Sequence, residues 1–379
     1  MGFRQPRVFR VCFLASVLLA AGCGGGGDEP PPAKPQAADA GAATALGRVA
    51  VGGPRASSEF VATYDRGEHL EPAPDGQTEI LRGVVPDPVS TLTESGDPVG
   101  SDPGRLSIQY EGGVESERLA RLVDDPVRAG NKVLAFTLLQ ANVVDASGLP
   151  TKGRVQMNAY DAGRLRAKEV RLTTRMYLPA DVALLREMST SMNWLTISEW
   201  WNDAGWTGGP YPFRVGVNIV KPSSIKGTAL NFSATAQTLD RATNQWSSPL
   251  WQVVNRTVQV PTGKWVTLEY SFLEGDESTG RFYMAMTPDG GIRRVLIDVR
   301  GWTHHPQNPA PDGLTQLNPL KLYTSKSAID HVRQMGGALS VYWDDLAIRL
   351  CRERGAEASS PCAPDSFGQG SRRSGSGSS

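Results

Sequence analysis

The sequence contains little that would support a metal centre, and it has no excess of either charge. Its 379 residues include only 4 cysteines and 4 histidines, and Lys+Arg and Asp+Glu each number 39. A general nucleic-acid binder needs a basic excess to pair with phosphates, so we expect no nucleic-acid partner. The apolar run from Val11 to Ala20 is too short to span a bilayer as a stable helix.

The N-terminus has the pattern of an export signal. Arg4, Arg7 and Arg10 precede the short apolar run, which closes with Ala20-Ala-Gly-Cys23. This ending resembles a bacterial lipobox, although Ala20 stands where that pattern prefers Leu. We therefore predict a signal peptide over residues 1–22, a lipid on Cys23, and an extracytoplasmic protein of the bacterial cell envelope that touches the membrane only through its anchor. The alternative is an ordinary secretory signal with an incidental cysteine.

The segments on either side of the central region contain little that a folded core would bury. Residues 23–45 are mostly Gly, Pro, Ala and Asp, and we expect a disordered tether there. Residues 353–379 are polar and end in a Ser/Gly/Arg tail, which we also expect to be disordered. Cys351 and Cys362 remain once the signal and anchor cysteines are set aside, and in an oxidising compartment we expect them to form a disulfide. Neither has a His or another Cys at metal-ligand spacing, so a zinc site is not expected.

Residues 46–352 show period-2 alternation in segment after segment, with no internal linker or repeat. This predicts a single all-β domain, a two-sheet antiparallel jelly roll with one or two short helices. The predicted helices are Pro179–Ser191 and Ser325–Gln334. The predicted strands are Lys132–Leu139, Arg154–Tyr160, Glu169–Leu178, Phe213–Ile219, Leu230–Gln237, Lys264–Phe272, Gly280–Thr287, Arg293–Val299 and Leu339–Leu350.

A tryptophan cluster precedes one of these strands. Four of the 9 tryptophans, Trp194, Trp200, Trp201 and Trp206, fall within thirteen residues beside Glu199. An indole ring stacks on the apolar face of a pyranose while neighbouring polar groups bind its hydroxyls. We therefore expect Trp201 and Trp206 to contact sugar. The alternative is that members of the cluster, such as Trp194 and Trp200, only fill the core.

The polar faces of three predicted strands carry rows of planar hydrogen-bonding groups. Such groups match sugar hydroxyls, and Arg can bind a uronate carboxylate through two hydrogen bonds. An ordinary solvated surface is the alternative for each residue taken alone. The polar-face residues predicted to form a binding groove are Arg154, Gln156, Asn158, Tyr160, Arg214 and Asn218.

The order of these elements resembles the concanavalin A-like jelly roll of lectins, glucanases and polysaccharide lyases, in particular the alginate- and heparin-lyase type. The matching pieces are Gly130–Phe136, Gly153–Met157, Tyr177–Asp181, Glu199–Trp201, Gly263–Trp265, Leu320–Ser325 and Tyr342–Leu346. In those lyases an Arg-Ser-Glu-type strand neutralises the uronate, a Gln-x-His strand supplies a carboxylate contact and a base, and a late strand supplies a Tyr. The resemblance places Arg154 and Gln156 on the first strand and Tyr323 on the late strand.

The sequence departs from that lyase pattern at the base. Glu199 and Trp201 stand where the Gln and His would be, so the base must come from His304 or His305, from Tyr160 or from Tyr323. In β-elimination a base removes the proton beside the carboxylate, while a cation or amide stabilises the enolate. The alternative for the histidine pair is a surface loop. A metal at that pair lacks a visible third ligand.

Two classes of function therefore remain. The first is a monomeric enzyme that cleaves an acidic polysaccharide by β-elimination, with Arg154, Gln156, Glu199, His305 and Tyr323 as its catalytic residues. The second is a non-catalytic glycan-binding surface lipoprotein. A glycoside hydrolase of the same fold would need a carboxylate pair, for which Glu199 with Glu269 or Asp298 are the candidates. No cofactor is predicted with certainty, and Asp344-Asp345 suit either a turn or a structural calcium ion.

Overall fold

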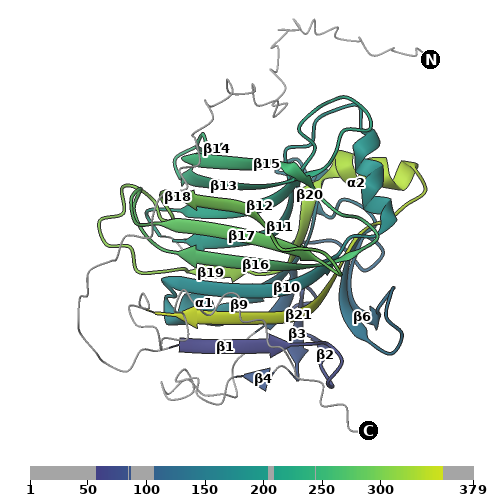
Figure 1. Cartoon of the computed structure of the whole chain (residues 1–379), viewed down its shortest axis with the longest axis horizontal. Helices are drawn as coiled ribbons and strands as arrows, with labels where there is room; N and C mark the ends of the chain where they lie inside the picture. Colours follow the sequence, from purple (N-terminus) through teal and green to yellow (C-terminus); the bar gives the residue numbers. More distant parts are fainter. Residues whose placement is uncertain (1–56, 84, 87–105, 204–208, 244, 353–379) are drawn as a thin grey trace, which may run out of the picture. The chain divides into compact units, whose positions relative to one another are not determined.

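The computed structural model describes residues 57–83, 85–86, 106–203, 209–243 and 245–352. These residues form two antiparallel sheets packed face to face, as Figure 1 shows. The jelly-roll class predicted from alternation is confirmed. The predicted signal peptide, tether and tail, with Cys23 and Cys362, lie outside the described residues. Among the described residues, no helix combines the length and apolar character that a membrane crossing needs.

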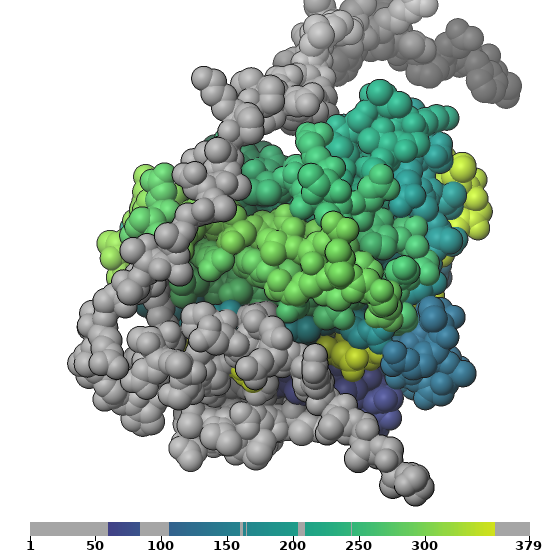
Figure 2. All heavy atoms as spheres, in the orientation of Figure 1, coloured from purple at the N-terminus to yellow at the C-terminus, as the bar shows by residue number. Residues whose placement is uncertain are grey.

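The first sheet faces the viewer in Figures 1 and 2, where the green atoms of its strands cover much of the front of the molecule. Seven strands form a hydrogen-bonded path in the order β18, β17, β16, β10, β21, β1 and β4. Strand β7 pairs with β21, and β6 pairs with β7. The strands are β18 (Arg294–Arg300), β17 (Arg281–Pro288), β16 (Trp265–Leu273), β10 (Glu169–Tyr177), β21 (Leu339–Cys351), β1 (Ser57–Ala62), β4 (Val85–Pro86), β7 (Lys132–Leu138) and β6 (Arg118–Asp124).

The second sheet carries the residues of interest. Its central path runs from β14 through β13, β12, β11, β19, β9, β5 and β3 to β2, while β20 pairs with both β11 and β9, β15 pairs with β13, and β8 with β9. The strands are β14 (Gln245–Trp246), β13 (Asn231–Asp240), β12 (Phe213–Val220), β11 (Leu195–Asn202), β19 (Gln316–Asn318), β20 (Lys321–Ser325), β9 (Pro150–Ala159), β5 (Leu106–Tyr110), β3 (Thr78–Arg82), β2 (His69–Pro72), β15 (Trp251–Gln259) and β8 (Val143–Val144).

The core fills the space between the two sheets because each strand turns its apolar residues inward. In β12 the inward set is Phe213, Val215, Val217 and Ile219, all fully buried. Trp200 of β11 stacks on Phe272 of β16 with ring centroids 5.7 Å apart. Because successive side chains of a strand point to opposite faces, Glu199 and Trp201 must point away from this core.

The helical segments differ in part from the prediction. Helix α2 spans Lys326–Gln334 and confirms the second predicted helix, with the Ser325 side chain as its N-cap. The segment predicted as the first helix is a 3₁₀ helix, η2, over Ala180–Glu187. The strand expected to reach Tyr160 ends one residue earlier, and α1 (Tyr160–Leu165) follows it. A Cβ at Gly163 would lie 2.3 Å from the Thr315 carbonyl oxygen, so this short helix packs directly on backbone.

Candidate functional site

Polar side chains of five neighbouring strands lie on one face of the second sheet. We call this surface the polar face, defined by three rows that cross β9, β20 or β19, β11, β12 and β13. Cross-strand pairing and the contacts given below define the rows. The first row is Arg154, Tyr323, Thr196, Asn218 and Ser233. The second row is Gln156, Lys321, Glu199, Gly216 and Thr235, and the third row is Asn158, Gln316, Trp201, Arg214 and Gln237.

An irregularity in β11 brings Glu199 and Thr196 to the same face. Strict alternation from Glu199 would put Ile197 on the polar face and bury Thr196. The pairing of β11 with β12 shifts by one residue between Thr196 and Ser198. Ile197 is therefore fully buried, and the Thr196 hydroxyl donates to Asn218 Oδ1 at 2.8 Å. A bulge of this kind re-aims side chains, and here it sets the direction of Glu199.

Glu199 is held between two cations in the middle of the polar face. Its carboxylate accepts from Arg214 Nη1 at 3.0 Å and from Lys321 Nζ. The side chains of Glu199 and Lys321 are only 3% and 2% exposed. Burial alone would raise the pKa of Glu199, but the charges of Lys321 and Arg214 outweigh it and the pKa lies below its usual value. Burial also lowers the pKa of Lys321, although Glu199 opposes this shift.

Arg214 links this ion cluster to two indole rings. Its guanidinium carbon lies 3.6 Å from the ring centroid of Trp246 and 5.7 Å from that of Trp201. Its Nη2 also donates to Gln237 Oε1 at 3.2 Å. Trp201 therefore lies on the polar face, but it is only 5% exposed, because it packs against Trp246. Trp206 lies outside the described residues, and Trp200 fills the core as the alternative interpretation expected.

Tyr323 lies beside two of the cations. Its ring contacts Trp194 at 4.7 Å between centroids, and Lys321 Nζ lies 5.1 Å from its centroid. Burial and the negative charge of Glu199 raise the pKa of Tyr323 to about 12, so the phenol keeps its proton at neutral pH. Arg154 of β9 is the cross-strand partner of Tyr323, with its guanidinium carbon 5.8 Å from the same ring and its Nη2 2.9 Å from Glu111. Arg154 Nε has no hydrogen-bond partner within the described part of the chain.

A cluster of buried amides continues the polar face from Arg154. Asn158 Oδ1 accepts from Gln156, Gln316 and Asn318 at 3.1, 2.9 and 2.6 Å. Gln156 also donates to Gln109 Oε1 at 3.2 Å. Gln156 Oε1 is buried and has no partner among the residues that the structure describes. Tyr160, predicted beside these residues, begins α1, and its side chain lies outside the described part.

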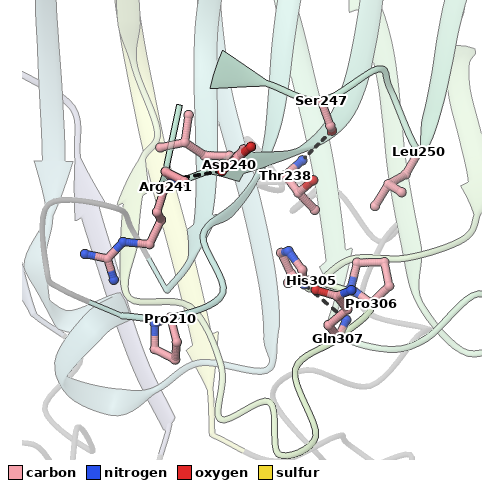
Figure 3. Close-up of a pocket in the computed structure, with 11 residues that line it drawn as sticks. Pro210, Thr238, Asp240, Arg241, Ser247, Leu250, His305, Pro306 and Gln307 are labelled. Carbon is pink, nitrogen blue, oxygen red and sulfur yellow. Dashed lines mark hydrogen bonds between the residues drawn. The ribbon is translucent and has the colours of Figure 1, made fainter. Parts of the chain in front are cut away.

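His305 lies elsewhere, in the loop that follows β18. Its ring packs on Tyr211 with centroids 5.5 Å apart and lines a pocket with Thr238 and Asp240, as Figure 3 shows. Burial lowers the pKa of His305, although Asp203 opposes the shift. His304 is buried beside it and contacts Trp302. The described residues thus group Arg154, Gln156, Glu199 and Tyr323 on the polar face and place His305 in a separate pocket.

The carboxylate pair of a glycoside hydrolase does not form. Glu269 is in β16 of the first sheet, between the core residues Leu268 and Tyr270, so it points out of the opposite side of the sandwich. It pairs with Arg293 at 2.5 Å, and Asp298 of the same sheet pairs with Arg281.

Asp344 is held by the protein's own donors. Asn131 Nδ2 donates to its carboxylate at 3.0 Å, and Arg175 Nη1 lies 3.7 Å away. Among the described residues, no group of three or more His, Cys, Asp or Glu side chains converges as metal ligands. At the far end of β21, Cys351 is disulfide-bonded.

Several contributors to this site were not singled out from the sequence, among them Lys321 and Trp246. Lys321 is two residues before Tyr323 and lies between Leu320 and Leu322, which are both buried, so the alternation indicated that Lys321 faces away from the core. Trp246 carried no such signal, because it lies in a two-residue strand and reaches Arg214 only through the pairing of β14 with β13.

No protein-family model matches this chain. No curated protein matches it either. Several solved structures are similar to it, and alginate and glucuronan lyases are among them. An alginate lyase from Aplysia kurodai is 10% identical, with 60% of this chain and 86% of that one covered at a TM-score of 0.35. An endo-β-1,4-glucuronan lyase from Trichoderma reesei is 13% identical, with 63% and 93% covered and a TM-score of 0.37. An exolytic alginate lyase from Zobellia galactanivorans is 10% identical, with 64% and 90% covered and a TM-score of 0.34. Likeness at this level transfers no activity, so the function is argued from the polar face.

Proposed function

We propose that this chain is an exported polysaccharide-active protein that cleaves an acidic, uronate-containing glycan by β-elimination on the polar face. The observation that carries the proposal is a group of three cations beside the protonated phenol of Tyr323. Lys321 and Arg214 pair with Glu199, and Arg154 pairs with Glu111. Cations on a surface attract an anionic polymer, and Arg matches the geometry of a carboxylate.

Each step of the elimination has a side chain to serve it. The guanidinium of Arg154, whose side chain is 22% exposed, binds the uronate carboxylate and stabilises the enolate that forms when the neighbouring proton is removed. Burial lowers the pKa of Lys321 to about 8, so above that pH its neutral amine accepts that proton, whereas below it the ammonium stays paired with Glu199. Tyr323 donates its proton to the glycosidic oxygen as the carbon–oxygen bond breaks and the double bond forms. Glu199 touches no reacting atom in this scheme and acts as a positioning residue for Lys321.

A second candidate is a non-catalytic glycan-binding lipoprotein. The observation that favours it is the pairing within the polar face, since Glu199 binds two cations and Asn158 accepts from three amides. Groups that satisfy one another in this way are suited to a rigid binding surface.

Export and anchoring through Cys23 belong to the proposal as well. The lipobox-like ending at Cys23 supports them. The disulfide at Cys351 also supports export, because disulfides persist in oxidising compartments.

The test is to incubate the purified chain with alginate, polyglucuronate and other uronate polymers and to follow the ultraviolet absorbance of unsaturated chain ends. We expect absorbance to rise on at least one polymer, and Tyr323→Phe to slow that rise by about 10²–10⁴-fold without weakening binding. Tyr283→Phe, on the first sheet, is the matched control and should leave the rate unchanged. Binding to a polymer without any rise would select the second candidate.

A further inference from the structure

A pocket of about 490 Å³ lies beside the polar face, at the turn that joins β13 to β14. Figure 3 shows the side chains that line it, with Thr238 and Asp240 from the hairpin on one side and His305, Pro306 and Gln307 on the other. Its volume lies within the range of small-molecule sites, which span roughly 300–1,000 Å³.

The pocket and the third row of the polar face share a wall. Gln237 ends that row, and its Oε1 accepts from Arg214. Its Nε2 donates to the carbonyl of Ser247, which lines the pocket. Leu239 is two residues further along β13, on the same face as Gln237, and it also lines the pocket while pairing with Trp246. Thr238 and Asp240 alternate with these residues and line the pocket from the other face of β13, so a glycan bound over Arg214 and Trp246 meets the pocket where it passes the end of the hairpin.

The charges of the pocket differ from those of the polar face. The polar face sets Arg154, Lys321 and Arg214 against Glu199 and Glu111. The charged residues that line the pocket are Asp240 and Arg241, whose formal charges cancel.

His305 contributes a neutral donor to the pocket. Its Nδ1 accepts from the backbone N–H of Gln307 at 3.1 Å, so the neutral ring carries its proton on Nε2. The depressed pKa of His305 agrees with a neutral ring at pH 7. The apolar part of the lining is Pro210, Leu239, Ala242, Leu250 and Pro306.

We infer that this pocket binds a neutral sugar unit of the same glycan whose uronate lies on the polar face, so that the substrate is a heteropolymer and not a chain of uronates alone. A neutral ring presents CH groups to the prolines and Leu250, and hydroxyls to His305 Nε2, Ser247 and Gln307. A uronate there would place its carboxylate near Asp240, while Arg241, the cation that lines the pocket, already donates to the carbonyl of Gly209. This inference rests on the proposed binding of an acidic glycan to the polar face.

The experiment compares two polymers on the full chain by titration calorimetry. One is a glucuronate homopolymer, and the other alternates glucuronate with a neutral hexose. We expect the alternating polymer to half-saturate the protein at a concentration at least tenfold lower. A preference below threefold, or one for the homopolymer, would overturn the inference.

Two variants assign the preference to the pocket. Leu250 is 39% exposed, so Leu250→Trp fills the pocket without disturbing the core and should reduce the preference to below twofold while homopolymer binding stays unchanged. His305→Phe keeps the ring that packs on Tyr211 and removes the donor, and should reduce the preference partly. Ile292→Trp is the matched control, because Ile292 is 69% exposed in the turn before β18.

The failure of this inference can be told apart from failure of the proposed function. If neither polymer binds and no polymer gains unsaturated ends, the polar face is not a site for acidic glycans and both ideas fall. If the homopolymer binds or is cleaved but the alternating polymer has no advantage, the polar face stands and the pocket assignment alone is wrong. A preference that persists in Leu250→Trp would likewise reject the pocket as its source.

Discussion

At the scale of single residues, the Lys321–Glu199–Arg214 cluster shows how burial makes a charge depend on its partners. An isolated buried carboxylate or ammonium is strongly destabilising, whereas a paired one is tolerated. Lys321 and Glu199 are almost fully buried, while the Arg214 side chain is 21% exposed. Lys321 is therefore the partner that Glu199 depends on most. Removing either residue should leave the other as an unpaired buried charge and lower the free energy of unfolding.

We expect Lys321→Met to lower the free energy of unfolding by about 3 kcal/mol, because removing one partner of a buried pair leaves an uncompensated charge. The double variant Lys321→Met/Glu199→Leu should recover most of that loss, since no buried carboxylate remains. Urea denaturation of the single and double variants measures both changes. Lys132→Met is the control: Lys132 pairs with Asp124 at an exposed site, and its loss should cost less than about 1 kcal/mol. Additive losses in the double variant would show that the pair is not coupled.

At the scale of the element, alternation predicted nine of the strands, all after residue 131, but neither the earlier strands nor the irregularities. The predicted ends of β7, β10 and β16 are right to within one residue, because long apolar/polar alternation has few other interpretations. The shift in β11 carries no such signal, because a bulge is set by pairing with β12 and not by the strand's own sequence. Strand β15 was missed because its residues are half-exposed to exposed and mix polar and apolar side chains.

The cap of α2 bears on the polar face because it closes β20 two residues after Tyr323. The Ser325 hydroxyl oxygen accepts from the backbone N–H of Ala328 at 3.4 Å. Ser325→Ala should lower the free energy of unfolding by about 1 kcal/mol. Ser325→Asp preserves an acceptor at the cap and should stay close to the wild type. Thermal unfolding of both variants is the measurement, and equal losses in the two would show that the cap bond is not what stabilises this helix.

At the scale of the whole molecule, the sequence predicted which residues are polar-facing but not which of them meet. Lys321 and Glu199 lie 122 residues apart in sequence, and they touch because β20 pairs with β11 at one end and with β9 along its length. Strand order of this kind is a property of the folded sheet, and alternation within one strand contains no information about it. The same limit explains His305: its loop joins β18 of the first sheet to β19 of the second, and only the closed sandwich places it in the pocket beside β13.

The packing of the whole sandwich also buries Asp344, and this gives the protein a pH dependence of defined sign. Burial raises the pKa of Asp344 to about 6, although Asn131 donates to it and opposes the shift. The folded state therefore holds this proton more tightly than the unfolded chain. The stabilisation that comes from proton binding at Asp344 is present in full below about pH 4 and is lost as the pH rises to about 6.

Asp344→Asn should remove this dependence. The difference in free energy of unfolding, wild type minus variant, should fall by up to about 3 kcal/mol between pH 4 and pH 7, because one pKa unit corresponds to about 1.4 kcal/mol. Urea denaturation at several pH values measures it. Asp276→Asn supplies a control of opposite sign, because hydrogen bonds from Thr279 and Ser278 lower the pKa of Asp276 to about 2. For this variant the difference in free energy of unfolding, wild type minus variant, should rise with pH. If the Asp344→Asn difference is the same at every pH, the carboxyl is not desolvated in the folded protein, and β21 does not pack against its neighbours as the structure has it.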